Sequence, residues 1–156
     1  AGTIIMADMV GARLEKAKEL GAAYTLKADE CDVIAEIDRI TEGKGVDVVL
    51  ETAGSPVTIA QTPFIVKRGG TICLVGIAAV EEINYNFGQI MDKEATIKSV
   101  FRYRNIYPKA IAAVASGAID VKGIVTHEYD LDHIQEAYEE AVNNKTDLVK
   151  AVIKVK

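Results

Sequence analysis

Two charged side chains near the start of the sequence have the types and the spacing to hold a nucleotide sugar. Asp8 follows the apolar run at residues 3–7, and Arg13 comes five residues later, in the first turn of a predicted helix. A carboxylate just past a strand can accept hydrogen bonds from both hydroxyls of a ribose and repels the 2′-phosphate of NADP, so the pattern favours NAD. The guanidinium of Arg13 can lie against an adenine or reach the ribose. Acids also cap helices at such turns, and the spacing leaves both interpretations of Asp8 open.

Residues suited to a flat or polar ligand also follow later apolar runs. Gly54 and Gly76 lie where two such runs end, and a glycine there lets the backbone approach a ligand closely. Turns require glycine too. Arg102 and Tyr103 follow another run, where they could face a polar substrate or lie on a solvated edge. At each position a binding role and an ordinary structural role stay open.

The other reactive side chains do not form a recognisable catalytic or metal-binding group. His127 and His133 have no His or Cys at metal-ligand spacing, which favours a surface or packing role for both. Cys31 and Cys73 are far apart in sequence and predict neither a disulfide framework nor a zinc knuckle. No Ser-His-Asp or Cys-His arrangement can be assembled. The residues therefore predict no catalytic side chain and no metal ligand in this chain.

The elements that must position these residues alternate between strands and helices over the first hundred residues. Apolar, β-rich runs predict strands over residues 3–7, 24–26, 46–50, 71–79, 95–103, 124–129 and 149–155. Helical spacing and end signals predict helices over residues 12–20, 33–40, 55–70, 108–117 and 132–143. Continuous apolar strands between helices indicate an α/β fold with a parallel sheet covered on both faces. Ligands bind beyond the carboxyl ends of such strands, where Asp8, Gly54, Gly76 and Arg102 fall.

The bulk composition is that of a globular protein of about one domain. The chain has 156 residues, of which 49% are apolar and 26% charged, with a net charge of −5. This apolar content is enough for a core and argues against disorder. The sequence has no basic stretch, no signal peptide pattern and no apolar run near the roughly 20 residues that span a membrane. We therefore expect a cytoplasmic protein without nucleic-acid or membrane partners.

The order of these features along the chain resembles the cofactor-binding half of the zinc-dependent medium-chain dehydrogenases, and most of all the sorbitol, xylitol and related polyol dehydrogenases. The resemblance covers essentially the whole chain. Its most specific stretches are DMVGARLEKAKELGA, GVDVVLETAGSP, KRGGTICLVG and SVFRYRNIYPKAI, and the last is characteristic of the polyol branch. The resemblance implies an oxidoreductase that transfers hydride from a secondary alcohol or polyol to NAD.

The resemblance also implies roles for individual residues. Asp8 would hold the adenosine ribose, and Arg13 would flank the adenine. The residues implied beside the nicotinamide ribose are Val75, Gly76 and Ile77, and those implied at the nicotinamide end are Val100, Phe101 and Arg102. Arg102 and Tyr103 would also face the polyol substrate.

The chain departs from the family pattern in what it lacks. The glycine-rich G-x-G-x-x-G turn, the central first strand, and the lobe that carries the zinc ligands precede Asp8 in the family and are absent here. The resemblance therefore implies a C-terminal fragment with no zinc ligands, inactive alone. Residues 1–104 would be a truncated Rossmann-type, doubly wound domain missing its first strand, and residues 105–156 would pack on the catalytic lobe. The parent enzyme would hold the zinc and form a homo-oligomer, a dimer or tetramer.

Loss of the central strand would leave two strands without a shared neighbour. In the dinucleotide fold the sheet order is 3-2-1-4-5-6, so the strands at 3–7 and 46–50 would each expose a row of backbone groups. We expect these strands either to pair directly or to be completed by a second copy of the chain. Two other functions stay open: an S-adenosylmethionine-dependent methyltransferase-like domain, which also places an acid after its second strand, and a non-catalytic nucleotide-binding module.

Overall fold

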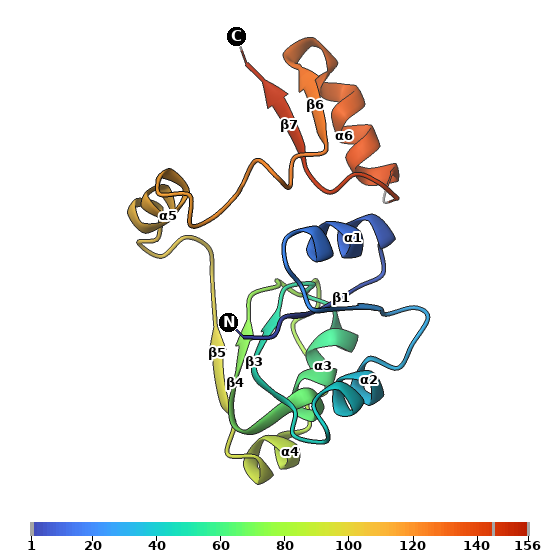
Figure 1. The fold of residues 1–156 in the computed structure, drawn as a ribbon, viewed down its shortest axis with the longest axis vertical. Helices are drawn as coiled ribbons and strands as arrows, with labels where there is room; N and C mark the ends of the chain where they lie inside the picture. The colour runs from blue at the N-terminus through green and yellow to red at the C-terminus, as the bar shows by residue number, and fades with distance from the viewer. Residues whose placement is uncertain (1, 145, 156) are drawn as a thin grey trace. The chain divides into compact units, whose positions relative to one another are not determined.

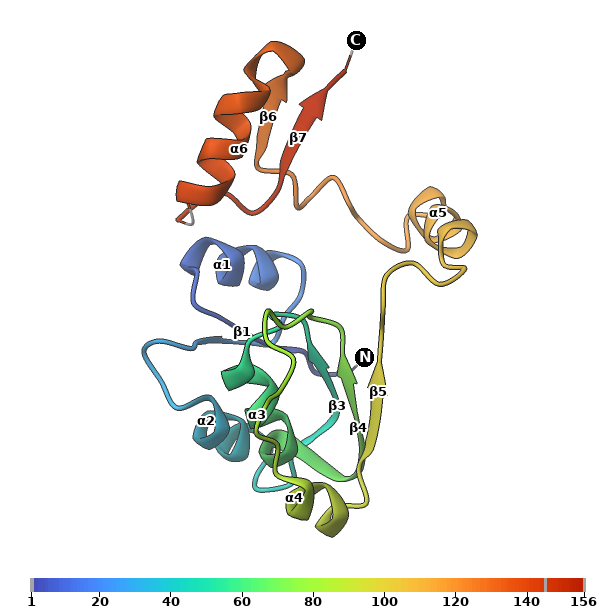
Figure 2. The same ribbon diagram turned by 180° about the vertical axis from the view of Figure 1, so that it is seen from behind.

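Short parallel strands alternate with helices along the chain (Figures 1 and 2). The computed structural model describes residues 2–144 and 146–155. Every paired strand among them is parallel to its neighbour, which confirms the prediction of an α/β fold with parallel sheets. The chain divides into two units: one is Asp32–Arg104, and the other contains the described residues before and after it.

The unit Asp32–Arg104 is built on a three-stranded sheet in the order β3-β4-β5. Its elements are α2 (Val33–Ile40), β3 (Val46–Glu51), α3 (Pro56–Ile65), β4 (Val66–Leu74), α4 (Phe87–Asp92) and β5 (Thr96–Ser99). Helix α3 packs against β3 and β4, and α2 lies beside α3 (Figure 1). The core of the unit consists of Val49, Val66, Ile72 and Ile90, of which Val66 and Ile72 are fully buried.

The helices of this unit begin where the sequence supplies caps. Asp32 accepts hydrogen bonds from the amides of Ile34 and Ala35 at 3.0 and 3.2 Å and so starts α2. Ser55 accepts the amide of Val57 at 3.3 Å, and Pro56 occupies the first helical position of α3. Each such cap stabilises a helix by about 1 kcal/mol.

Helix α3 ends at Ile65, so the helix predicted over residues 55–70 is wrong at its C-terminal end. The residues from Val66 onward join β4, where Val46 of β3 pairs with Val66 but Val48 pairs with Thr71. The ammonium group of Lys93 donates to the carbonyl oxygens of Phe64 and Val66, at 2.7 Å each. The strand pairing and the Lys93 hydrogen bonds both involve residues distant in sequence. They outweigh the local sequence pattern that predicts a helix up to residue 70.

Helix α4 is an element that the sequence does not predict. It has six residues, and only Ile90 among them is buried. Phe87 and Met91 are 63% and 77% exposed, so its apolar residues do not form one buried stripe. A helix of this length offers too few turns for a periodic pattern.

Within the unit Asp32–Arg104, helix α3 covers one face of the β3-β4-β5 sheet. Val49 and Glu51, which point to that face, are 8% and 4% exposed, whereas Val48 and Leu50, on the opposite face of β3, are 54% and 65% exposed. The helix on the first face agrees with the predicted layers of an α/β fold.

The second unit contains two short strand pairs. Strand β1 (Ile5–Asp8) pairs with β2 (Tyr24–Lys27), and α1 (Gly11–Glu19) packs against both. Leu14 of α1 and Leu26 of β2 are buried. Further along the chain are α5 (Tyr107–Ala115), β6 (His127–Asp130), the 3-10 turn η1 (Leu131–His133), α6 (Ile134–Asn143) and β7 (Ala151–Lys154), with β6 pairing with β7.

The two strands expected to lose a shared neighbour belong to different units of the chain. Within the described part of each unit, β1 pairs with β2 and β3 pairs with β4. Direct pairing of β1 with β3 and completion of the sheet by a second copy of the chain both stay predictions.

Candidate functional site

Asp8 and Arg13, the predicted sugar-binding pair, lie together at the carboxyl end of β1. Asp8 Oδ1 accepts the amide of Val10 at 2.8 Å, and Asp8 Oδ2 lies 3.5 Å from Arg13 Nη1. The Val10 contact is what the helix-start interpretation predicts, because Val10 precedes α1 and has no side chain that can cap it. The second oxygen faces the guanidinium and keeps lone pairs for a further donor. One carboxylate can thus serve the helix start and still accept a sugar hydroxyl.

The loops that follow β3 and β4 meet at the carboxyl edge of their sheet, and backbone contacts bring them together. A Cβ added to Gly76 would lie 2.1 Å from the nitrogen and 2.7 Å from the Cα of Gly54. Gly54 has a φ of +66°, and its added Cβ would lie 2.5 Å from the carbonyl oxygen of Ile77. Both glycines are required for the two loops to approach one another. Their approach to a flat ligand stays a prediction.

A buried carboxylate lies beneath this junction. Glu51 ends β3 with 4% of its surface exposed, and its Oε1 accepts the amides of Ala53 and Gly54 at 3.1 and 3.0 Å. The hydroxyl of Thr58 donates to the same oxygen at 2.7 Å. Glu51 falls at a strand end, where a ligand is expected, but its sequence position predicts no role for its carboxylate or for Thr58. The signal that could have found Glu51 is its position two residues after Val49, on the buried face of the strand.

The residues expected at the nicotinamide end lie just past β4 and β5 and present apolar surface to solvent. The exposed fractions are 38% for Val75, 71% for Ile77, 45% for Val100 and 72% for Phe101. The amide of Val100 donates to the carbonyl oxygen of Leu74 at 2.9 Å, which holds this segment against β4. The structure therefore brings these four residues to one edge of one sheet.

Arg102 and Tyr103, the predicted substrate-facing residues, continue from the same segment. The guanidinium of Arg102 lies 5.0 Å from the centre of the Phe101 ring, a cation–π contact, and Arg102 has a φ of +56°. Tyr103 is 64% exposed. An arginine in the left-handed region is uncommon, and this conformation marks the turn out of β5.

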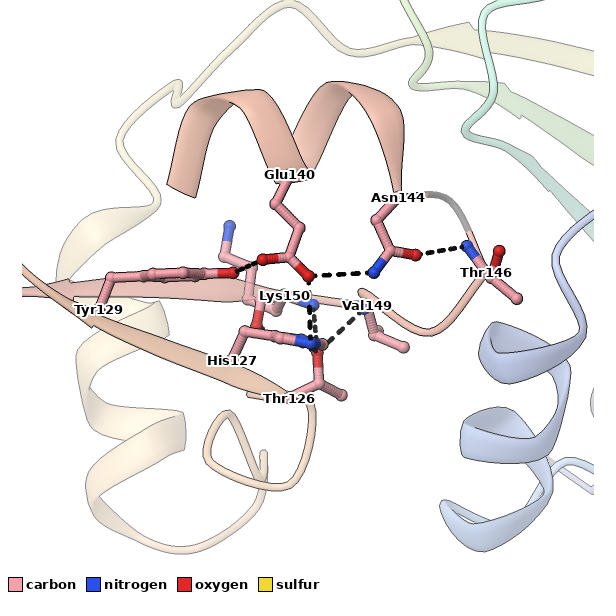
Figure 3. A network of polar contacts seen from close by, with 8 residues as sticks. All are labelled: Thr126, His127, Tyr129, Glu140, Asn144, Thr146, Val149 and Lys150. Carbon is pink, nitrogen blue, oxygen red and sulfur yellow. Dashed lines mark hydrogen bonds and ion pairs between the residues drawn. The ribbon is translucent and has the colours of Figure 1, made fainter. Parts of the chain in front are cut away.

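His127 takes part in a polar network between β6 and α6 (Figure 3). Its Nδ1 lies 2.9 Å from Thr126 Oγ1, and its Nε2 lies 3.9 Å from Glu140 Oε1. Tyr129 donates its hydroxyl hydrogen to Glu140, and Asn144 donates to Glu140 at 3.1 Å. The hydrogen bond to Glu140 raises the pKa of Tyr129 to about 12, and the same bond lowers the pKa of Glu140. His127 therefore has polar neighbours both next to it in the chain and on α6, and a surface or packing role for it stays a prediction.

We expect Tyr129→Phe to lower the melting temperature in a pH-dependent way. The Glu140 contribution is present above the usual glutamate pKa of 4.5 and is lost as the pH falls through the lowered value. The Tyr129 contribution is present below pH 10.0 and is lost as the pH rises toward about 12. The difference between wild type and variant should therefore be largest near neutral pH and shrink at both extremes.

Thermal unfolding followed by circular dichroism across this pH range measures the difference. Tyr138→Phe is the matched control, because Tyr138 lies on α6, the helix that carries Glu140, and is 68% exposed. A Tyr129→Phe penalty that is the same at acid, neutral and alkaline pH would show that the Tyr129–Glu140 bond does not stabilise the fold.

The part of the chain that the structure describes contains no group of three or more His, Cys, Asp or Glu placed to hold a metal ion. Within the same residues, no helix is both long and apolar enough to cross a membrane.

Comparisons with known proteins agree on one family. The family model described as zinc-binding dehydrogenase matches residues 1–116. The chain is 46% identical over 155 residues to the uncharacterized zinc-type alcohol dehydrogenase-like protein YdjJ of Escherichia coli K12, and 42% identical over 153 residues to the sorbitol dehydrogenase of Bacillus subtilis. These alignments cover 99% and 98% of this chain but only 44% and 43% of the relatives, so the chain spans less than half of their length.

Solved structures show the same fold. An Escherichia coli oxidoreductase/dehydrogenase of unknown specificity matches with a TM-score of 0.89 and 45% identity, over 99% of this chain and 44% of that one. A zinc-binding dehydrogenase of Sinorhizobium meliloti, solved bound to NADP, matches with a TM-score of 0.88 and 26% identity, over 99% and 46% of the two chains. A protein of Escherichia coli CFT073 described as a short chain alcohol dehydrogenase, solved with NADH, matches in fold with a TM-score of 0.89 and 23% identity, over 99% and 45%.

Proposed function

This chain belongs to the zinc-binding dehydrogenase family, and we propose that it is the NAD-holding part of an alcohol or polyol dehydrogenase. Hydride would pass from a secondary alcohol, of the sorbitol or xylitol kind, to the cofactor. The similarity to a sorbitol dehydrogenase over 98% of the chain supports this substrate class. The whole enzyme would be longer than this chain, with residues 1–104 as the cofactor domain and residues 105–156 packing on a catalytic lobe.

The observation that carries the proposal is the Asp8–Arg13 pair at the end of β1. Asp8 Oδ2 would accept hydrogen bonds from the adenosine ribose, while Arg13 would lie beside the adenine. The negative charge of Asp8 disfavours a 2′-phosphate, so NAD would bind more tightly than NADP. A similar solved structure contains NADP, so members of this fold differ in the dinucleotide they bind. The relative affinity of this chain for NAD and NADP is therefore the quantity to measure.

The residues beyond β4 and β5 fit the other end of the cofactor. Val75, Gly76 and Ile77 would run beside the nicotinamide ribose, and the exposed apolar surface of Val100 and Phe101 would exclude water from a flat ring. When bound, NAD supplies the hydride acceptor.

Arg102 and Tyr103 would orient the substrate hydroxyls by hydrogen bonding. The described residues offer no set of zinc ligands. In the proposed enzyme the metal would therefore be held outside the described residues of this chain.

Calorimetric titration of the natural gene product with NAD and with NADP tests the proposal. We expect NAD to bind, with an affinity about tenfold or more above that for NADP, and the protein to reduce NAD in the presence of sorbitol or xylitol. Binding of neither dinucleotide would overturn the proposal. Binding of NAD without oxidation of any polyol or secondary alcohol would favour the non-catalytic module. The family assignment leaves the methyltransferase interpretation without support.

A further inference from the structure

We propose that Glu51 is a positioning residue that fixes the nicotinamide end of the cofactor site by holding the β3–α3 loop and the segment after β4 in one arrangement. The inference rests on the proposed function, because it concerns the segment Val75–Ile77 on which the cofactor would lie. Glu51 itself is buried beneath that segment and would act through it.

The side chain of Glu51 holds the first loop. Glu51 is buried, with only 4% of the residue exposed, and the hydrogen-bond donors to its carboxylate among the described residues are all neutral. They are the amides of Ala53 and Gly54 and the hydroxyl of Thr58. A buried carboxylate is costly unless such donors satisfy it, and hydrogen bonds to an ionised acceptor are about twice as strong as neutral ones. These hydrogen bonds therefore hold the β3–α3 loop against the end of β3.

The main chain of the same residue holds the second segment. The carbonyl oxygen of Glu51 accepts the amide of Val75 at 2.8 Å and the amide of Gly76 at 2.9 Å. Both amides belong to the stretch that leaves β4. One residue thus fixes the loop after β3 through its carboxylate and the segment after β4 through its carbonyl group.

The two loops cannot move independently, because they touch through their backbones. The Gly54 and Gly76 positions leave no room for a single methyl group between them. A displacement of Gly54 away from the Glu51 carboxylate must therefore displace Gly76 and Ile77 as well. Because Ile77 is 71% exposed on the cofactor side of this junction, a shift there changes the surface that a dinucleotide meets.

Two substitutions weaken this arrangement in different ways. Glu51→Gln keeps the size of the side chain, removes the charge, and turns one acceptor oxygen into a donor that faces the Gly54 amide, which lies 3.3 Å from Oε2. Thr58→Val keeps the volume but removes the hydroxyl donor, whereas Thr58→Ser retains it. Glu81→Gln, at an exposed loop position, is the matched control for the loss of a carboxylate.

Steady-state kinetics and calorimetry on the natural gene product provide the functional readout. We expect Glu51→Gln and Thr58→Val to raise the KM and the Kd for NAD about tenfold while kcat changes less than twofold. Thr58→Ser and Glu81→Gln should stay within about twofold of wild type. Hydrogen exchange of the Gly54 and Gly76 amides gives a readout without cofactor, and we expect it to become about tenfold faster in both weakened variants.

The outcomes separate this inference from the function on which it rests. Unchanged NAD affinity in Glu51→Gln, with only a lower melting temperature, would show a purely structural role and overturn the inference. The inference would also be overturned if Thr58→Ser bound NAD as weakly as Thr58→Val. Unchanged hydrogen exchange of the Gly76 amide in the weakened variants would overturn it too. A wild-type protein that binds no dinucleotide would overturn the proposed function and this inference together.

Discussion

Replacing Gly76 with alanine is expected to abolish dinucleotide binding and to lower the free energy of unfolding by about 3 kcal/mol. The added methyl group would lie 2.1 Å from the Gly54 nitrogen and 2.7 Å from the Gly54 Cα. Both are backbone atoms, so rotation of a side chain cannot relieve the overlap. The segment after β4 must move away from β3, and the amides of Val75 and Gly76 then lose their acceptor on Glu51.

Urea unfolding and NAD titration measure these two effects of Gly76→Ala. Gly2→Ala is the control, because no atom lies within 4 Å of its added methyl group. The control should change the unfolding free energy by less than about 1 kcal/mol. If Gly76→Ala unfolds at the wild-type urea concentration and binds NAD normally, the close approach of the two loops is not required.

The second large effect is a change of cofactor preference in Asp8→Asn. Asparagine keeps an oxygen for the Val10 amide and so preserves the start of α1, but it loses the negative charge. We expect NAD affinity to fall about tenfold, because the ribose hydroxyls lose a charged acceptor, and NADP affinity to rise about tenfold. Arg13, which lies 3.5 Å from Asp8 in the wild type, becomes available to the 2′-phosphate.

Parallel titrations with NAD and NADP measure the ratio of affinities, which should fall about a hundredfold in total. Asp120→Asn is the control, because Asp120 Oδ1, like Asp8 Oδ1, accepts a local backbone amide; in this case there are two, from Lys122 and Gly123, at 2.9 Å each. This variant should leave the ratio unchanged. An unchanged ratio in Asp8→Asn would leave Asp8 with the helix-start role alone.

Elements with a complete local signal could be predicted from the sequence. Helix α2 has the predicted bounds, because Asp32 supplies its cap and the apolar residues recur at helical spacing. The end of α3 could not be predicted, because Lys93 and the pairing of Val46 with Val66, both distant in sequence, determine it. Helix α4 was missed because its six residues bury only Ile90.

The candidate site shows the same division between local and distant contacts. The spacing of Asp8 and Arg13 predicts that both lie at one strand–helix turn, and the ion-pair contact between them required the structure. The contact of Asp8 with the Val10 amide was foreseen as an alternative, and its coexistence with the Arg13 contact required the structure. The burial of Glu51 has a sequence signal, but its contacts could not be predicted, because Gly54 and Gly76 belong to two loops that meet only in the folded chain.

The exposed residues Val48 and Leu50 of β3 have a thermodynamic consequence for the unit Asp32–Arg104 taken by itself. Because both side chains contact water before that unit unfolds, its unfolding hydrates less new apolar surface than unfolding of a sheet enclosed on both sides. For this unit alone we expect a heat-capacity increment of unfolding below the usual value of about 12–15 cal/mol/K per residue. A smaller increment gives a flatter dependence of stability on temperature, so cooling would weaken the isolated unit less than it weakens a protein whose sheets are enclosed.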